Sequence, residues 1–132
     1  MTALFRSLVV LLSACVVLLA SSLAWAGEPK AFDPAAFKAA QAAGKPILVE
    51  IHADWCTECK VQNRILNKLS DQAPYNAVVR LRVDYDKQKD VVKDFKAKKQ
   101  STLVVYKGDK ELARAVGITS EEKIRALVDK AI

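Results

Sequence analysis

One stretch decides the fold, and it reads Ile47-Leu48-Val49-Glu50-Ile51-His52-Ala53-Asp54-Trp55-Cys56-Thr57-Glu58-Cys59-Lys60. The run from Ile47 to Ile51 is almost continuously apolar and contains β-branched residues, which predicts a strand buried on both faces. After Trp55 the apolar spacing changes to that of a helix beginning near Cys56. Two cysteines, three positions apart, therefore open a helix that follows directly on a buried strand.

The flanking sequence predicts a fold of the α/β class. Asp33-Pro34 is typical of a helix start, and Gly44 of its end. Later apolar patterns predict strands at 78–83, 102–106 and 111–116, a helix at 88–97, and a last helix opened by a capping box of Thr119 and Glu122. The order of elements predicts a four-stranded mixed sheet with helices on both faces, with parallel early strands and an antiparallel final hairpin.

The composition limits the class of protein. A chain of 132 residues that is 52% hydrophobic and 27% charged suits one globular domain and excludes a disordered chain. Three cysteines are too few for a disulfide-dense scaffold. The formal net charge of +6 makes the protein mildly basic.

The first 26 residues differ from the rest. They carry Arg6, an apolar run and an Ala24-Trp25-Ala26 end, which predicts a secretory signal peptide cleaved after Ala26. Two alternatives stay open: an uncleaved anchor, and a lipoprotein acylated at Cys15. Cleavage would leave a single domain, 27–132, in an oxidising compartment where disulfides persist.

The spacing of Cys56 and Cys59 favours redox chemistry. A helix N-terminus stabilises a thiolate and lowers its pKa, so Cys56 is the predicted nucleophile and Cys59 the resolving thiol. A closed zinc site needs four ligands, and after cleavage only Cys56, Cys59 and His52 offer sulfur or imidazole. A disulfide closing so short a loop would stabilise the fold little.

The segment Ala53 to Lys60, following the strand at 47–51, resembles the thioredoxin family, and most closely its exported bacterial members. The resemblance covers nearly all of residues 27–132. It implies a thioredoxin-like fold, thiol–disulfide exchange through a mixed disulfide, and no bound cofactor. It also implies protein disulfide substrates, a membrane electron donor, a monomer and a location in the bacterial periplasm.

Two further residues match the family pattern. Glu50 stands where the family often buries an acid, whose role would be to accept the proton of Cys59; the alternative is a carboxylate turned to solvent at a sheet edge. Trp55 precedes the nucleophile, where the family ring flanks the active site and contacts substrate; the alternative is core packing.

One position departs from the family. Ser101 stands where a cis-proline is expected, and a cis bond before a residue other than proline costs about 3–4 kcal/mol, so we predict a trans Gln100–Ser101 bond. In the family this loop holds the substrate backbone, so Ser101 and Thr102 are predicted to bind substrate.

His52 and Glu58 are candidates for tuning the cysteines. Strand alternation puts His52 on the same face as Glu50, where it could tune Cys56, have no role, or join Cys56 and Cys59 as a copper ligand in a metal-handling module. A negative charge at Glu58 opposes a thiolate, which favours a reductant over an oxidant.

The remaining charge pattern is less specific. Lys93, Lys96, Lys98 and Lys99 form either a solvated face or a surface that steers an acidic partner. Nucleic-acid binding is not expected, because the chain reads as exported and carries no binding motif. A third possibility is a domain that keeps the fold but acts as a partner-binding adaptor.

Overall fold

A computed structural model describes residues 27–132. The predicted signal peptide at 1–26 and the alternative acylation site at Cys15 lie outside the described residues. Within 27–132, the helices are all too short or too polar to span a lipid bilayer.

The sheet is mixed, as predicted, but it has five strands rather than four. Its order is β1-β3-β2-β4-β5. β2 runs parallel to β3 and antiparallel to β4, which forms an antiparallel hairpin with β5. The bounds are β1 Lys30–Ala31, β2 Pro46–His52, β3 Val79–Asp84, β4 Thr102–Lys107 and β5 Lys110–Val116.

The additional strand was missed because it carries no strand pattern of its own. β1 has two residues, both exposed, and pairs in parallel with Leu81 and Arg82 of β3. Its conformation comes from tertiary pairing at the sheet edge and not from local sequence.

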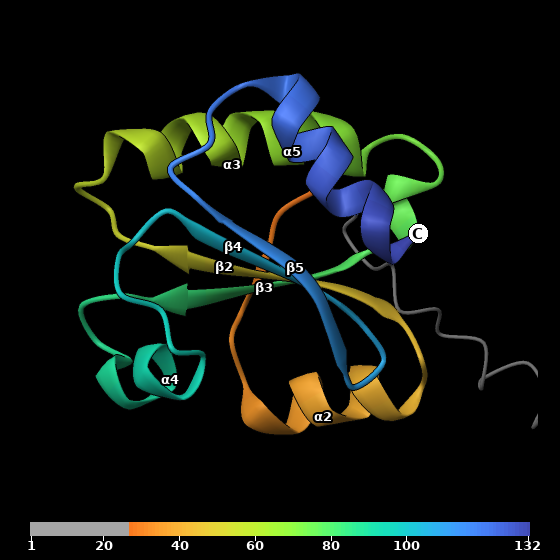
Figure 1. The fold of residues 1–132 in the computed structure, drawn as a ribbon, viewed down its shortest axis with the longest axis horizontal. Helices are drawn as coiled ribbons and strands as arrows, with labels where there is room; N and C mark the ends of the chain where they lie inside the picture. The colour runs from red at the N-terminus through yellow and green to blue at the C-terminus, as the bar shows by residue number, and fades with distance from the viewer. Residues whose placement is uncertain (1–26) are drawn as a thin grey trace, which may run out of the picture.

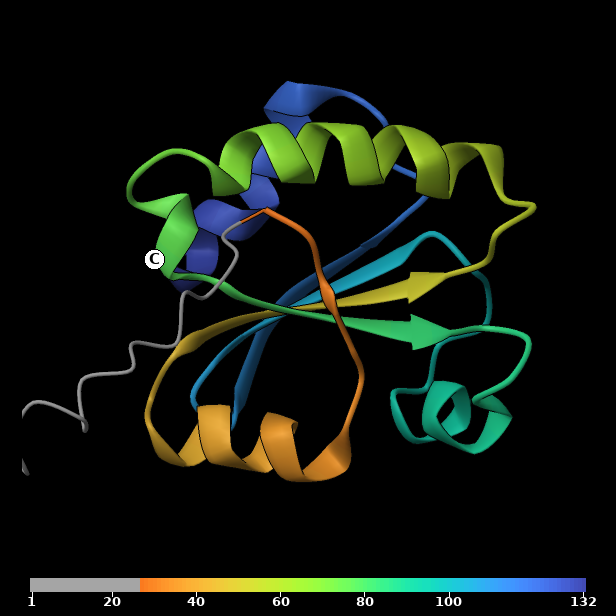
Figure 2. The same ribbon diagram turned by 180° about the vertical axis from the view of Figure 1, so that it is seen from behind.

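Helices cover both faces of the sheet (Figures 1 and 2). One face carries α3 and α5, and the other carries α2 and α4. Two single-turn 3₁₀ helices, η1 and η2, complete the fold. The bounds are α2 Pro34–Ala42, α3 Thr57–Ser70, η1 Tyr75–Ala77, α4 Lys89–Asp94, α5 Glu121–Val128 and η2 Asp129–Ala131.

Alternation along β2 divides the core into two layers. Ile47, Val49 and Ile51 pack in the cluster that includes Phe32 and Phe95, on the α2 and α4 side. Leu48 packs in the cluster under α3 and α5. Glu50 and His52 share the Leu48 face, so β2 carries two ionisable side chains under α3.

Two helix ends differ from the predictions. α4 ends earlier than expected, because Lys96 takes a left-handed backbone with φ of 52° and the chain leaves the helix there. α5 is capped by Ser120, whose hydroxyl accepts from the Lys123 N–H at 3.3 Å, and not by Thr119. A Ser one position closer to the helix takes over the capping role.

Candidate active site

The two cysteines lie where β2 turns into α3. Cys56 is the N-cap of α3, and its sulfur accepts from the Cys59 backbone N–H at 3.1 Å. Cys56 and Cys59 form a disulfide, with their Cα atoms 5.2 Å apart. A backbone N–H of the first turn of the helix thus donates to the sulfur of Cys56, as expected for a cysteine at a helix N-terminus, and would stabilise a thiolate there.

The disulfide is buried. Cys56 is 1% exposed and Cys59 2% exposed, and both pack with Ala53 and against Tyr85. Cys59 Sγ lies 3.9 Å from the Ile51 carbonyl oxygen, at the end of β2. The sulfur atoms are therefore held between the end of the sheet and the first turn of α3.

Trp55 lies on the surface beside this pair, which is the expected flanking position and not the alternative of core packing. It is 60% exposed. Its Nε1 donates to Asp86 Oδ2 at 2.8 Å. Its ring packs edge-on against the Tyr85 ring, with the two ring centroids 6.5 Å apart. An exposed aromatic ring with a fixed orientation offers contact area to a polypeptide at little entropic cost.

The Ser101 loop is bonded to the end of β2. Among residues 27–132 the cis peptide bond is Ala73–Pro74, so Gln100–Ser101 is trans, as predicted. The Ser101 N–H donates to the Ile51 carbonyl at 2.8 Å, a bond that proline could not make. Both Ser101 and Thr102 are buried, and Thr102 Oγ1 donates to the Lys99 carbonyl at 2.7 Å.

Restoring proline at position 101 is expected to destabilise the protein. Ser101 has a φ of 59°, which the proline ring cannot adopt, and Ser101→Pro also removes the bond to Ile51. We expect a loss of about 3 kcal/mol in the free energy of unfolding, measured by urea denaturation. Ser101→Gly, which keeps the N–H and accepts positive φ, should be neutral or stabilising; equal losses in both variants would contradict this account.

Gln62 links this loop to α3, and sequence reasoning missed it. The side chain is 3% exposed. Its Nε2 donates to the carbonyls of Ser101 at 3.1 Å and Ile118 at 3.0 Å. A glutamine on the apolar side of an amphipathic helix was the available signal, since buried amides need partners.

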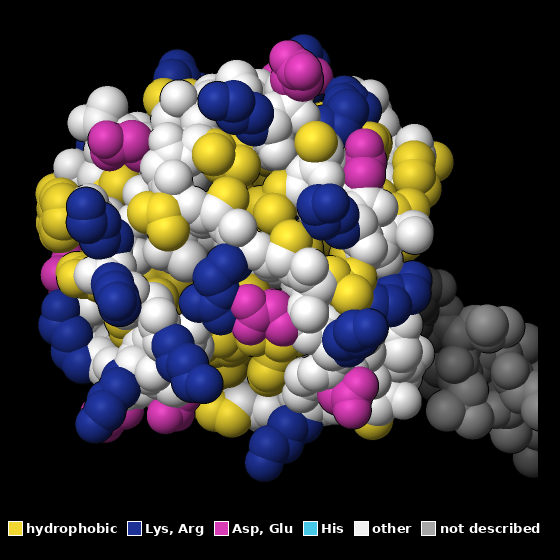
Figure 3. All heavy atoms as spheres, viewed as in Figure 1, with side chains coloured by type: hydrophobic (Ala, Val, Ile, Leu, Met, Phe, Trp, Pro, Cys, Tyr) yellow, Lys and Arg dark blue, Asp and Glu magenta, His cyan; other side chains and the backbone are white. Residues whose placement is uncertain are grey.

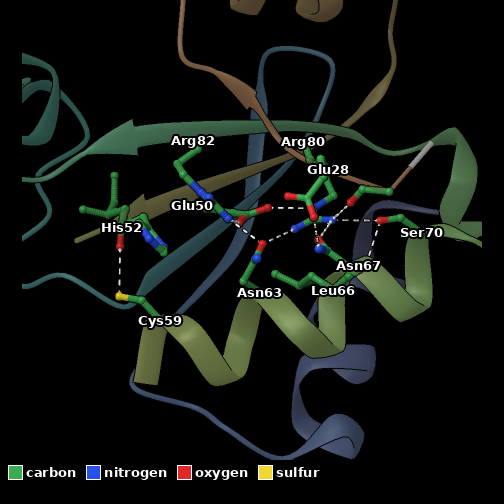
Figure 4. A network of polar contacts seen from close by, with 12 residues as sticks. Glu28, Glu50, His52, Cys59, Asn63, Leu66, Asn67, Ser70, Arg80 and Arg82 are labelled. Carbon is green, nitrogen blue, oxygen red and sulfur yellow. Dashed lines mark hydrogen bonds and ion pairs between the residues drawn. The ribbon is translucent and has the colours of Figure 1, made fainter. Parts of the chain in front are cut away.

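Glu50 is buried, so the solvent-turned alternative does not hold. Its carboxylate meets two arginines of β3, at 2.7 Å from Arg80 Nε and 3.5 Å from Arg82 Nη2. Figure 4 shows the carboxylate directed into this network. The register places Glu50 opposite Arg82, on the neighbouring strand. The carboxylate therefore has two cationic partners, and its predicted role toward Cys59 stays a prediction.

Arg80 connects this ion pair to α3, and its role was not predicted. It is 6% exposed and also donates to Asn67 Oδ1 at 2.8 Å and Ser70 Oγ at 3.3 Å. A further bond reaches the Gly27 carbonyl. A buried guanidinium is stable only with its donors paired, and β2 (through Glu50), α3 and residue 27 supply the acceptors.

His52 lies two residues after Glu50 on the same face of β2, nearer the cysteine end of the strand (Figure 4). Its Nε2 is 3.5 Å from Asp54 Oδ1, and its side chain is 14% exposed. Burial lowers the pKa of His52 below its usual 6.5, and Arg82 lowers it further, against the opposing effects of Asp54 and Glu50. The imidazole is therefore neutral at pH 7 and able to accept a proton.

This lowered pKa predicts a loss of stability in mild acid. Below about pH 6.5 the unfolded chain binds a proton at His52 that the folded protein does not, so the free energy of unfolding falls as the pH drops toward the folded pKa. His52→Gln should flatten that dependence between pH 7.5 and 5, measured by urea midpoints. Parallel curves for the two proteins would contradict the assignment.

Glu58 is exposed, and its Oε2 lies 3.8 Å from Cys56 Sγ. Its charge therefore acts on the sulfur at short range, as its position between the cysteines suggested. Within residues 27–132 no three His, Cys, Asp or Glu side chains are grouped to hold a metal ion. The geometry thus gives no support to the copper alternative through His52.

Comparison with known proteins agrees with this site. The family model described as Thioredoxin matches residues 28–130. The chain belongs to the thioredoxin family. A thioredoxin of Chlamydia muridarum is 31% identical over 84 residues, 64% of this chain and 80% of its own. An H-type thioredoxin of Fagopyrum esculentum is 30% identical over 91 residues, 69% of this chain and 77% of its own.

Solved structures of thioredoxins share the fold. The Trxlp protein of Edwardsiella tarda is 38% identical, with a TM-score of 0.71 over 79% of this chain and 98% of its own. The thioredoxin NaTrxh of Nicotiana alata is 28% identical, with a TM-score of 0.67 over 79% of this chain and 95% of its own. The thioredoxin-like fold is confirmed, with the additional strand β1.

The family and the cysteine pair together define the chemistry. The chain is a thiol–disulfide oxidoreductase of the thioredoxin type, and thioredoxins act on protein disulfides.

Proposed function

We propose that the protein is an exported reductant that cleaves disulfides in proteins of the bacterial periplasm. The observation that carries the chemical part is Cys56 as N-cap of α3, with its sulfur bonded to the Cys59 N–H and Cys59 one turn away. The leader pattern in the sequence of residues 1–26, with its apolar run and its Ala24-Trp25-Ala26 end, supports export.

The proposed reaction has two exchanges. The Cys56 thiolate attacks one sulfur of the target disulfide, whose S–S bond breaks, and the other target sulfur leaves as a thiolate. The Cys59 thiolate then attacks Cys56 Sγ, breaks the mixed disulfide and releases the target as a dithiol. Two electrons pass to the target, and the resulting Cys56–Cys59 disulfide must be reduced again by a donor, which we propose to be a membrane protein.

One charge near the cysteines supports the direction of transfer. Glu58, 3.8 Å from Cys56 Sγ, disfavours the thiolate and so favours the disulfide form of this protein, which makes its reduced form the better electron donor. Neutral His52 and buried Glu50 are the proposed proton acceptors for Cys59, the second of them restrained by Arg80 and Arg82.

Catalytic reduction of insulin by dithiothreitol tests the reaction. The purified protein should accelerate the precipitation of the reduced insulin chain at substoichiometric concentration. Equal rates with and without the protein would contradict the proposed function.

Export has its own test. The protein recovered from the periplasm of a Gram-negative host should begin at Gly27, as determined by intact mass. A chain retained in the cytoplasm with Met1 would contradict export, and one acylated at Cys15 would contradict cleavage after Ala26.

A further inference from the structure

A basic hollow lies beside the Ser101 loop, and the reaction proposed above makes no use of it. It has a volume of about 460 Å³ and is lined by Lys96, Ala97, Lys98, Lys99, Thr102, Arg114 and Val116. Thr102 pairs with Ile51 on one side and Val116 on the other. The basic hollow is therefore one strand away from the end of β2, where the Ile51 carbonyl contacts Cys59.

Its apolar part is uncovered. Val116 is 52% exposed, and Trp55, at 60%, is the other large exposed apolar side chain near the cysteine end of the sheet. These two side chains belong to different elements, β5 and the turn after β2. Together they offer a polypeptide apolar contacts at two points around the cysteine pair.

Three of the four cations around the hollow have no ion-pair partner among residues 27–132. Lys96, Lys98 and Lys99 are exposed, and none of them has a carboxylate partner within 4 Å among residues 27–132. Arg114 differs, because it is paired with Glu111 at 2.6 Å. Figure 3 shows Lys and Arg side chains gathered over α4 and the segment that leads into β4.

The Trp55 side of the site carries exposed carboxylates. Asp54 has a 96% exposed side chain and Glu58 is exposed between the cysteines, whereas Asp86, which accepts the Trp55 Nε1–H, is paired with Lys89 at 3.7 Å. A target segment lying across the cysteine pair thus meets acidic groups at one end and lysines at the other. Such a field favours a target with negative charge on only one flank.

We propose that the basic hollow is a docking subsite for acidic polypeptide segments, which selects target disulfides with carboxylates on one side of the cysteine. The inference rests on the proposed function, since it names the substrates of that site. The occupant follows from charge complementarity: Lys96, Lys98 and Lys99 line the hollow together with Ala97 and Val116, beside Ser101, whose N–H bonds to the same Ile51 carbonyl that Cys59 contacts.

Three disulfide-linked peptide dimers test the proposal. They share one sequence around a single cysteine and carry three Asn on both sides, three Asp before the cysteine, or three Asp after it. The second-order rate constant for reduction by the pre-reduced protein is followed by Trp55 fluorescence at low ionic strength. We expect one of the two Asp peptides to react about three- to tenfold faster than the Asn peptide. The other Asp peptide should react no faster than the Asn peptide.

Charge reversal identifies the surface responsible. Lys98→Glu/Lys99→Glu should abolish or invert the preference for that Asp peptide, and salt of about 0.5 M should remove it from the unmodified protein. Lys107→Glu/Lys110→Glu is the matched control, because it makes the same charge change at the far end of the β4–β5 hairpin. The control should keep the preference.

The outcomes separate the two proposals. Equal rates for all three peptides, or equal losses of preference in both double variants, would overturn the docking subsite while leaving the reductase function intact. Failure to reduce any of the peptides would overturn the proposed function and the subsite with it.

Discussion

Replacing Cys56 by serine is expected to abolish turnover with protein disulfides, while Cys59→Ser is expected to stop the reaction halfway. Cys56 is the cysteine whose sulfur receives the Cys59 N–H at the start of α3, so without it no thiolate is stabilised for the first attack. Without Cys59 the first exchange still occurs, but the mixed disulfide has no internal thiol to resolve it.

Non-reducing gel electrophoresis and intact mass distinguish the two variants. Cys59→Ser incubated with an oxidised protein substrate should accumulate a covalent adduct through Cys56, and Cys56→Ser should form none. Turnover that survives in Cys56→Ser, or an adduct formed through Cys59 alone, would reverse the assigned roles.

Replacing Arg80 by methionine is expected to produce the largest loss of stability among single changes outside the core. The guanidinium is 6% exposed and makes a 2.7 Å ion pair with Glu50, so its removal leaves a buried carboxylate with Arg82 alone, at 3.5 Å. Breaking a buried pair in this way costs about 3–5 kcal/mol. Urea unfolding of the oxidised protein measures the loss.

A surface ion pair provides the matched control. Lys68 contacts Glu121 at 3.5 Å, but its side chain is 67% exposed, so Lys68→Met should cost less than about 1 kcal/mol. Glu50→Leu combined with Arg80→Met should recover much of the stability lost in Arg80→Met, because no fully buried charge is left unpaired: Arg82 loses Glu50, but its side chain is 25% exposed and still donates to Asn63. A cost for Arg80→Met as small as that for Lys68→Met would show that the buried network contributes little.

Local patterns were sufficient to predict most of the fold and the cysteine pair. The apolar run of β2, the change of period at Cys56 and the trans bond before Ser101 all follow from local chemistry, and the structure agrees with each. The two-residue strand β1 and the early end of α4 at Lys96 depend on tertiary pairing and on one backbone conformation, which local sequence does not specify.

The polar network under α3 could not be predicted in the same way. Arg80 and Arg82 alternate with apolar residues along β3, a pattern that normally places arginines in solvent. Arg80 is buried and Arg82 half-buried because Glu50 stands on the adjacent strand and because α3 turns Asn63, Asn67 and Ser70 toward them. The acceptors come from three elements, so the burial of Arg80 is a property of the assembled fold.

The most direct test of the account is the reduction potential of the Cys56–Cys59 pair in thiol redox buffers. Trp55, the single tryptophan of residues 27–132, reports the equilibrium by fluorescence. If the protein is a reductant and Glu58 disfavours the Cys56 thiolate, the reduction potential should lie near that of thioredoxin, about −270 mV. A potential near −120 mV would define a disulfide-forming oxidant and contradict the proposed direction of electron flow.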